Sequence, residues 1–401
     1  MRDSVAAYGN LFNLSDKQHG RIRPRIVADA VRKVSKNKAR RRRTKFVNYP
    51  AMLNITVESQ ATKPLCNLFG SCGGCQFQDI PYEEELARKE AILKDLLQKE
   101  IKVPESVFDP ITASPQVYYY RHRLDLTLRK RNNGERQMGF MLPGTQRLQE
   151  VVACPIARKE INDFLPLLKE EAVRKLPADY RVANLVVRVG EEGKVSWGGI
   201  GRRSLKMKEE DYFSVTINRK KIFYALDTFF QANLFILEKI IGKIEGLIAW
   251  QRDTVFLDLY SGVGLFGIML ADRAREVVMI ESGCDSVRLA RYNVAYHHLE
   301  NVRIMEGNVE IHLPEVLKEL KDRPCVGLID PPRNGLAASA VETLVKANDL
   351  TSLFYLSCSP ESLARDLKGL TREAWRIRKI MPFDFFPRTR HLETLVWLER
   401  L

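Results

Sequence analysis

The sequence predicts an α/β protein whose C-terminal part is a doubly wound, Rossmann-like sheet, preceded by a mixed α+β region. From about residue 255 onward, short apolar runs alternate with amphipathic helical patterns, as buried parallel strands and their crossover helices do. The run 255–257 is followed by Gly262, Gly264 and Gly267 at G-x-G-x-x-G spacing, and then by an apolar helical pattern. A strand, a tight turn and a helix start therefore follow each other in the order of a nucleotide-binding unit.

Length and composition describe a globular protein of two or three domains. The chain has 401 residues, of which 45% are hydrophobic and 28% charged. No apolar stretch approaches the length of a membrane span, and the N-terminus has no signal-peptide hydrophobic region. We therefore expect no membrane association, a cytoplasmic location and a monomer.

The basic charge is concentrated in an N-terminal arm, residues 1–48. The net charge is +14, and residues 1–45 hold 14 Lys or Arg against 3 Asp or Glu, so that the remainder of the chain is nearly neutral. Such a block is typical of a partly disordered, solvated tail. It also suits RNA, because a polyelectrolyte arm adds affinity that depends on salt and not on sequence.

Four of the seven cysteines form a candidate ligand set. Cys66, Cys72 and Cys75 lie within ten residues among glycines, and Cys154 appears later before a proline. Four thiolates can bind zinc or an iron–sulfur cluster. Structural zinc more often shows two C-x2-C pairs, so the pattern of a triad with a distant Cys-Pro favours a [4Fe–4S] cluster over zinc or free thiols.

The remaining patterns give the domain boundaries. A helix is predicted over 81–98, an alternating strand from residue 118 with arginines on one face, a helix over 155–168, and strands over 182–189, 195–197 and 222–226. Aromatic and arginine side chains at 118–129 suit stacking and pairing with RNA, although a solvated strand face explains them equally well. We expect a central RNA-binding and cysteine-cluster domain (49–80 and 110–226) and a catalytic domain (81–109 and 227–401).

The glycine loop indicates a nucleotide-like cofactor. The second strand pattern, 277–281, ends in Glu281, an acid placed to hold ribose hydroxyls. NAD and S-adenosylmethionine both fit this unit, and a purely structural turn is the alternative.

Three reactive side chains lie at the ends of apolar, strand-like runs. They are Asp330 and Cys358, each at the end of such a run, and Glu393, which is expected just before the last strand, 394–398. Carbon 5 of a pyrimidine is a poor nucleophile until a thiolate adds at C6. It can then attack a sulfonium methyl group, after which a base removes the C5 proton and the thiol is eliminated. Cys358 is the candidate nucleophile and Glu393 the candidate base, whereas Cys284 and Cys325 are expected to be small buried side chains.

From Cys66 to the C-terminus the sequence resembles the RNA 5-methyluridine methyltransferase family. The resemblance rests on six blocks in the family's order, which are the four cysteines with Pro155, Phe229-Phe230-Gln231-x-Asn233, Asp258-Leu259-Tyr260-Ser261-Gly262-x-Gly264, Asp330-Pro331-Pro332-Arg333-x-Gly335, Ser357-Cys358-x-Pro360, and Phe386-Pro387-x-Thr389-x-His391-x-Glu393.

The resemblance implies S-adenosylmethionine as cofactor. It places Gln231, Tyr260, Glu281 and Asp330 at that cofactor, beside the backbone of Gly262 and Gly264. It also implies Cys358 as nucleophile, Glu393 as base, a [4Fe–4S] cluster on the four cysteines, and a target uridine flipped out of its stack. Cluster-bearing bacterial relatives mostly act on large-subunit ribosomal RNA, so 23S rRNA is the favoured partner and transfer RNA the alternative.

Two departures from the family and several competing functions bear on this interpretation. The chain shows no N-terminal oligonucleotide-binding barrel pattern, and Ser359 stands where many relatives have Asn or Asp. RNA 5-methylcytosine methyltransferases typically carry a second cysteine where this chain has Arg333. Amino-methyltransferases share Asp-Pro-Pro but need no Cys358, and a dehydrogenase leaves the cysteines and Glu393 unexplained. An RNA-binding assembly factor without catalysis is the non-enzymatic alternative.

Overall fold

The computed structural model describes residues 61–199 and 211–401, and all of these belong to one compact unit. The predicted basic arm, residues 1–48, lies outside the described residues, as do the first residues of the predicted central domain. None of the helices in the described part of the chain has the length and apolar character that a membrane span requires.

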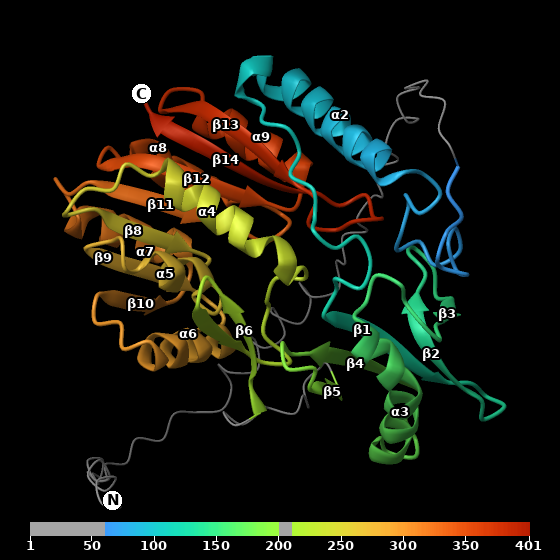
Figure 1. Ribbon diagram of the computed structural model, residues 1–401. Coiled ribbons are helices and arrows are strands. Elements are labelled where there is room, and N and C mark those ends of the chain that lie inside the picture. Colours follow the sequence, from blue (N-terminus) through green and yellow to red (C-terminus); the bar gives the residue numbers. More distant parts are fainter. Residues whose placement is uncertain (1–60, 200–210) are drawn as a thin grey trace, which may run out of the picture. The chain divides into compact units, whose positions relative to one another are not determined.

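The larger sheet has seven strands in the order β10-β9-β8-β11-β12-β14-β13 (Figure 1). The strands from β10 to β12 are parallel, and β14 runs antiparallel to both of its neighbours. Every residue of β8 and β11 is buried, which explains their uninterrupted apolar sequences. The strand bounds are β8 (Val255–Leu259), β9 (Glu276–Glu281), β10 (Val302–Glu306), β11 (Cys325–Ile329), β12 (Leu350–Ser357), β13 (Trp375–Phe383) and β14 (Glu393–Arg400).

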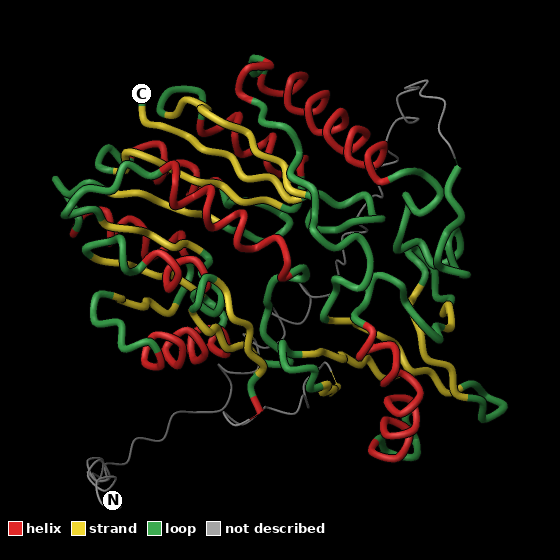
Figure 2. The backbone as a smooth tube through the Cα atoms, viewed as in Figure 1, coloured by secondary structure: helices red, strands yellow, loops and turns green. Residues whose placement is uncertain are grey.

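Helices cover both faces of this sheet (Figure 2). One face packs on α4 (Leu237–Leu247), α5 (Leu265–Leu270) and α6 (Cys284–Tyr296). The other packs on α2 (Tyr82–Ile101), α7 (Val309–Glu319), α8 (Ala338–Lys346) and α9 (Pro360–Leu370). The strand order reverses between β8 and β11, so their carboxyl ends form the switch point at which doubly wound sheets bind ligands.

A second, five-stranded antiparallel sheet has the order β3-β2-β1-β4-β5. Its apolar face packs on helix α3 (Lys159–Lys175) in a core of its own. Its strands are β1 (Arg123–Lys130), β2 (Arg136–Met141), β3 (Leu148–Glu150), β4 (Val182–Val189) and β5 (Val195–Gly199). The hairpin β6 (Phe213–Ile217) and β7 (Lys220–Tyr224) and two short 3₁₀ helices, η1 (Glu105–Val107) and η3 (Leu234–Ile236), complete the described elements.

The predicted doubly wound sheet is confirmed, and several element boundaries differ from the sequence expectation. The strand expected from residue 118 begins at Arg123, because Tyr119 adopts a left-handed conformation with φ of 56°. The helix expected from residue 155 begins at Lys159, since residues 155–158 hydrogen-bond to residues 119–121 instead. Glu393 is the first residue of β14 and does not precede that strand.

Candidate active site

The glycine loop between β8 and α5 is held by the strands on either side of it. Gly262 and Gly264 have φ values of 57° and 87°, which other residues rarely adopt. The Gly267 N–H donates a hydrogen bond of 2.7 Å to Oδ2 of Asp258, which is buried. The loop therefore has one conformation, fixed by a carboxylate of the strand that precedes it.

Glu281, at the end of β9, contacts the same loop. Its two carboxylate oxygens accept hydrogen bonds from the backbone N–H groups of Gly262 (2.9 Å) and Gly283 (2.6 Å). The carboxylate thus lies at the mouth of the glycine loop, at the carboxyl edge of the sheet where the sequence placed it.

A small cavity at the switch point brings together four of the six predicted cofactor residues. Gln231 and Asp330 meet there through a 3.2 Å hydrogen bond from Gln231 Nε2 to Asp330 Oδ2. Gly264 and Glu281 do not line this cavity, and Glu281 reaches it through the backbone of Gly262. The lining residues are Phe229, Phe230, Gln231, Tyr260, Ser261, Gly262, Val263, Leu265, Phe266 and Asp330.

The aromatic and apolar part of this lining was not identified from the sequence as a contact surface. Phe229 is 67% exposed although it lines the cavity, which is unusual for so large an apolar side chain. The available signal was its place beside Phe230 and Gln231 in a recognised block.

Cys358 and Glu393 lie at adjoining strand ends. Strand β12 pairs with β14 antiparallel, with Ser357 opposite Thr394, so the next pair in this register is Cys358 opposite Glu393. The strands thereby bring the predicted nucleophile and the predicted base together from positions 35 residues apart in the sequence.

Burial and charge both act on these two groups. Burial, and secondarily the Glu393 carboxylate, raise the pKa of Cys358 to about 11, whereas Arg333 lowers it. Burial also raises the pKa of Glu393 well above its usual range, and Asp330 adds to this effect. Cys358, Glu393, Asp330 and Arg333 therefore form one interacting group, and Asp330 belongs both to it and to the cofactor cavity.

Arg333 is a member of this group that was not predicted from the sequence as a functional residue. Burial raises the pKa of Cys358 and of Glu393, and the Arg333 cation acts in the opposite direction on both. Its place at the end of Asp-Pro-Pro-Arg was the signal available.

The four predicted ligand cysteines all line a single cavity of about 260 Å³ between the cysteine-rich loop and β1. Burial raises the pKa of Cys75 to about 12, and the thiolates of Cys154, Cys66 and Cys72 add to this effect. Within 61–199 and 211–401, no three His, Cys, Asp or Glu side chains are placed to hold a single metal ion. The four cysteines therefore share one cavity without the close grouping, among the described residues, that would hold a single metal ion.

Comparisons with known proteins identify related RNA methyltransferases. The family model described as tRNA (Uracil-5-)-methyltransferase matches residues 199–401. An uncharacterized RNA methyltransferase of Clostridium tetani is 29% identical over 386 residues, covering 84% of this chain and 83% of the relative. The 23S rRNA (uracil(1939)-C(5))-methyltransferase RlmD of Haemophilus parainfluenzae is 28% identical over 363 residues, covering 84% and 82%.

A solved structure gives the same fold. The tRNA (uracil-54, C5)-methyltransferase of Pyrococcus abyssi, in complex with S-adenosyl-L-homocysteine, aligns with a TM-score of 0.63 and 23% identity, covering 81% of this chain and 85% of that one. The fold prediction is thereby confirmed for the Rossmann-like methyltransferase core. With a family model matching half of its length, the chain belongs to the family of RNA (uracil-5-)-methyltransferases.

Proposed function

We propose that this protein uses S-adenosylmethionine to methylate carbon 5 of a specific uridine in RNA, with 23S ribosomal RNA as the favoured substrate. The observation that carries the proposal is the position of Cys358 and Glu393 at adjoining ends of β12 and β14, where the Asp330 carboxylate acts on both and also lines the cofactor cavity. A nucleophile, a base and a cofactor site within one group of contacts are what C5 methylation requires.

We place S-adenosylmethionine at the switch point, where it would supply an electrophilic methyl group when bound. Glu281 is placed to accept hydrogen bonds from ribose hydroxyls at the glycine loop. The backbone of Gly262 and Gly264 allows close approach, while Gln231, Tyr260 and Asp330 line the cavity. A lining of polar side chains beside apolar and aromatic ones suits a cofactor that carries a charged amino acid and an adenosine.

Each reacting side chain has a defined task. The Cys358 thiolate adds to C6 of the flipped uracil, which turns C5 into the nucleophile that takes the methyl group. Glu393 then removes the C5 proton, the C6–sulfur bond breaks and the Cys358 thiolate is released, leaving 5-methyluridine and S-adenosylhomocysteine as products and the proton on Glu393. Arg333 supports the first step because its cation favours the thiolate over the thiol.

The choice of RNA follows from the similarity to RlmD, which extends over more than four-fifths of both chains. Transfer RNA is the second candidate, because the structure with the same fold belongs to a tRNA methyltransferase. The five-stranded sheet supports an RNA-binding role for the central region (49–80 and 110–226), because exposed arginine side chains lie at the start of β2 (Arg136) and in the adjoining loops (Arg131 and Arg147).

We also propose that Cys66, Cys72, Cys75 and Cys154 hold a [4Fe–4S] cluster. A zinc ion needs sulfurs about 2.3 Å from one point, whereas a cluster needs a larger space enclosed by four thiolates. The shared cavity of about 260 Å³ supports the cluster over zinc. Protein isolated without oxygen is expected to contain about four irons and four acid-labile sulfides per chain, and stoichiometric zinc would contradict this assignment.

The experiment that tests the reaction is mass spectrometry of nucleosides from ribosomal and transfer RNA, purified separately from cells with and without the gene. Loss of 5-methyluridine from 23S rRNA is the expected result, and loss from transfer RNA would support the second candidate. Unchanged 5-methyluridine in both fractions, with the protein expressed in the control cells, would contradict the proposed function.

A further inference from the structure

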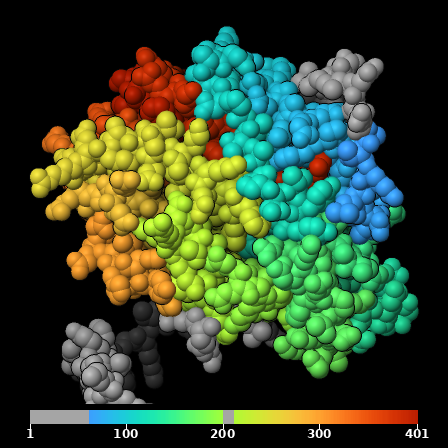
Figure 3. Space-filling view, in the orientation of Figure 1, coloured from blue at the N-terminus to red at the C-terminus, as the bar shows by residue number. Residues whose placement is uncertain are grey.

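The loop that leads into Glu393 is held by segments from the opposite end of the chain. Residues 384–392, here named the base loop, connect β13 to β14. Residues 66–75, here named the cysteine loop, contain three of the four candidate ligand cysteines. In Figure 3 a few red atoms of the C-terminal part surface as islands among the blue and cyan segments that precede β1.

Arg388 is the central residue of the base loop. It is buried and adopts a left-handed conformation with φ of 66°. Its Nη1 donates hydrogen bonds to the carbonyl oxygens of Phe77 (3.0 Å) and Ile80 (2.9 Å). Its guanidinium lies over the rings of Tyr82 and Tyr118, 5.5 and 5.2 Å from their centroids. Any movement of the loop would break several of these contacts at once.

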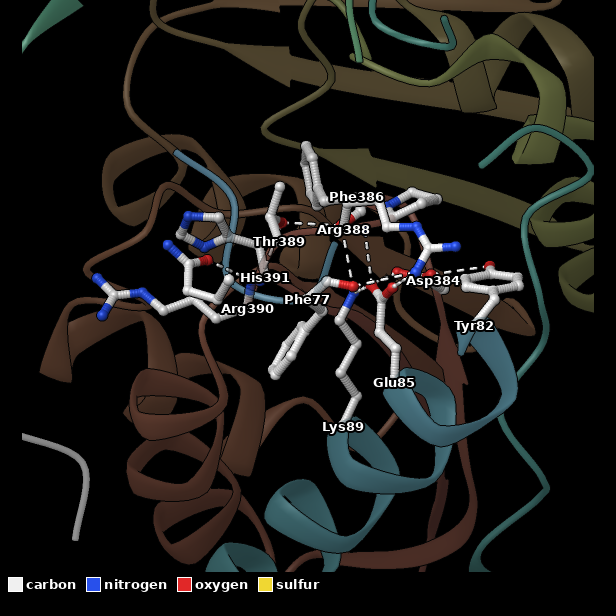
Figure 4. Close-up of polar contacts among 12 residues, drawn as sticks. Phe77, Tyr82, Glu85, Lys89, Asp384, Phe386, Arg388, Thr389, Arg390 and His391 are labelled. Carbon is white, nitrogen blue, oxygen red and sulfur yellow. Dashed lines mark hydrogen bonds and ion pairs between the residues drawn. The ribbon is translucent and has the colours of Figure 1, made fainter. Parts of the chain in front are cut away.

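Buried charges fix the same loop to α2 (Figure 4). Lys89 Nζ lies 2.7 Å from Glu85 Oε1 and 2.7 Å from Asp384 Oδ1. Glu85 Oε1 in turn accepts a 2.7 Å hydrogen bond from the Arg388 backbone N–H, and Tyr82 donates one of 2.8 Å to Asp384. Buried ion pairs contribute little net stability, but they do select one geometry, because any alternative leaves a charge without a partner.

Gln76, one residue after Cys75, connects the two loops directly. Its side-chain Nε2 donates to the Gly73 carbonyl of the cysteine loop (2.8 Å), while its Oε1 accepts from the Arg390 N–H of the base loop (2.9 Å). Its backbone N–H donates to the Arg388 carbonyl at 2.9 Å. Gln76 therefore links the cysteine loop to the base loop, which leads into Glu393.

We propose that Gln76 and Arg388 are positioning residues: Gln76 clamps the base loop to the cysteine loop, and Arg388 clamps it to residues 77–82, which follow that loop, so that the four-cysteine site controls the placement of Glu393. The inference rests on the proposed function, because it assigns the clamp to the step that Glu393 performs. Neither residue touches the cofactor cavity or Cys358 in the structure.

The clamp has a specific kinetic consequence. A displaced Glu393 removes the C5 proton slowly, whereas addition of Cys358 and methyl transfer precede that step and need no base at C5. Loss of the clamp is therefore expected to leave the enzyme joined to methylated RNA. A misplacement of about 1 Å is enough to slow a positioned group on the order of 100-fold.

The experiment compares wild type, Arg388→Met and Gln76→Ala as cluster-loaded, full-length protein. The probe is an unmodified 23S rRNA transcript, or a tRNA transcript if wild type methylates that instead. The labelled products of a single turnover with radiolabelled S-adenosylmethionine are separated, and the denaturation-resistant protein–RNA adduct and the released RNA that contains 5-methyluridine are each measured over time. Iron content and S-adenosylhomocysteine affinity are measured on each variant, as is hydrogen exchange of peptides covering 384–392.

We expect adduct to form at near wild-type rates in both variants and to resolve on the order of 10- to 100-fold more slowly in Arg388→Met, with a smaller delay in Gln76→Ala. Hydrogen exchange should rise in the base loop while iron content and cofactor affinity stay unchanged. Arg323→Met is the matched control, since Arg323 is ion-paired with Glu276 (2.7 Å) at the amino end of β11, away from both loops.

Gln76 is only partly buried, so its variant is expected to fold even if Arg388→Met does not. The proposal is overturned if both soluble variants resolve the adduct like wild type, or if adduct formation and resolution slow equally. A wild-type protein that forms no 5-methyluridine at all would instead contradict the proposed function.

Discussion

The cofactor loop and the Cys358–Glu393 pair lie at the same edge of one sheet but are built in different ways. The loop is one continuous unit, β8–α5–β9, whose decisive hydrogen bonds join Asp258 to Gly267 and Glu281 to Gly262. The reactive pair comes from two strands and depends on a loop that segments 76–89 hold in place. One site is specified locally, whereas the other is specified by contacts across most of the chain.

The two regions also differ in what stabilises them. The strands under the cofactor loop are buried in continuous apolar cores on both faces. The base loop is held mainly by buried charges and by side-chain hydrogen bonds to backbone groups (Figure 4). Apolar packing tolerates small adjustments, whereas removing one member of a buried charge network leaves its partner charge unpaired. The position of Glu393 should therefore be more sensitive than the cofactor loop to single substitutions far from the reacting atoms.

The largest effect is expected from Cys358→Ala. Removal of the nucleophile should reduce methylation by at least about three orders of magnitude, because C5 is not activated without addition at C6. Cofactor affinity, measured by calorimetry with S-adenosylhomocysteine, should stay close to wild type. Cys284→Ala is the control and should retain activity, because Cys284 is exposed and not buried as the sequence predicted. Substantial methylation by Cys358→Ala would show that Cys358 is not the nucleophile.

Lys89→Met tests the charge network. Two buried carboxylates, Glu85 and Asp384, would lose their shared cation, so the free energy of unfolding should fall by about 3–5 kcal/mol. Lys94→Met on the same helix removes a partly exposed cation from Glu90 and Glu105, and should change the free energy of unfolding by less than about 1 kcal/mol. Equal losses of unfolding free energy for the two variants in denaturant titrations would contradict a stabilising role for the buried charge network.

Gly264→Ala tests the local site. Its φ of 87° strains any side chain, and an added Cβ would lie 3.1 Å from Met279 Sδ, so cofactor affinity should weaken by about 1–2 kcal/mol. Gly242→Ala in α4 meets nothing within 4 Å and should stabilise the protein by about 0.5–1 kcal/mol. Unchanged affinity in Gly264→Ala would contradict a close approach of cofactor to the loop.

The smallest effect concerns ionisation of Cys358. Its pKa is raised to about 11, so the thiol dominates at neutral pH and the thiolate fraction grows about tenfold per pH unit below that value. Alkylation of Cys358 by iodoacetamide should therefore keep accelerating up to about pH 11. Arg333→Gln removes the cation that lowers this pKa, so alkylation at about pH 9 should become slower. Faster alkylation in that variant would reverse the assigned effect of Arg333.

The same contrast explains what could be predicted from the sequence. The parallel strands and the glycine loop were predictable, since their burial and turn geometry are written in runs of adjacent residues such as 255–268. The arrangement around Glu393 was not. Glu85 and Lys89 lie on a helix predicted as simply amphipathic, and only the tertiary structure shows that both are buried against Asp384. Arg388 occupies a variable position inside a recognised block, so no motif drew attention to it.

The most direct test of the account is the reaction of Glu393→Gln with RNA and S-adenosylmethionine, followed by denaturing electrophoresis and peptide mass spectrometry. Proton removal follows methyl transfer, so this variant is predicted to accumulate a denaturation-resistant adduct that joins Cys358 to methylated uridine. Wild type should release its product and show little of this species. Release of 5-methyluridine by Glu393→Gln at the wild-type rate, with no adduct, would contradict the assignment of Glu393 as the base.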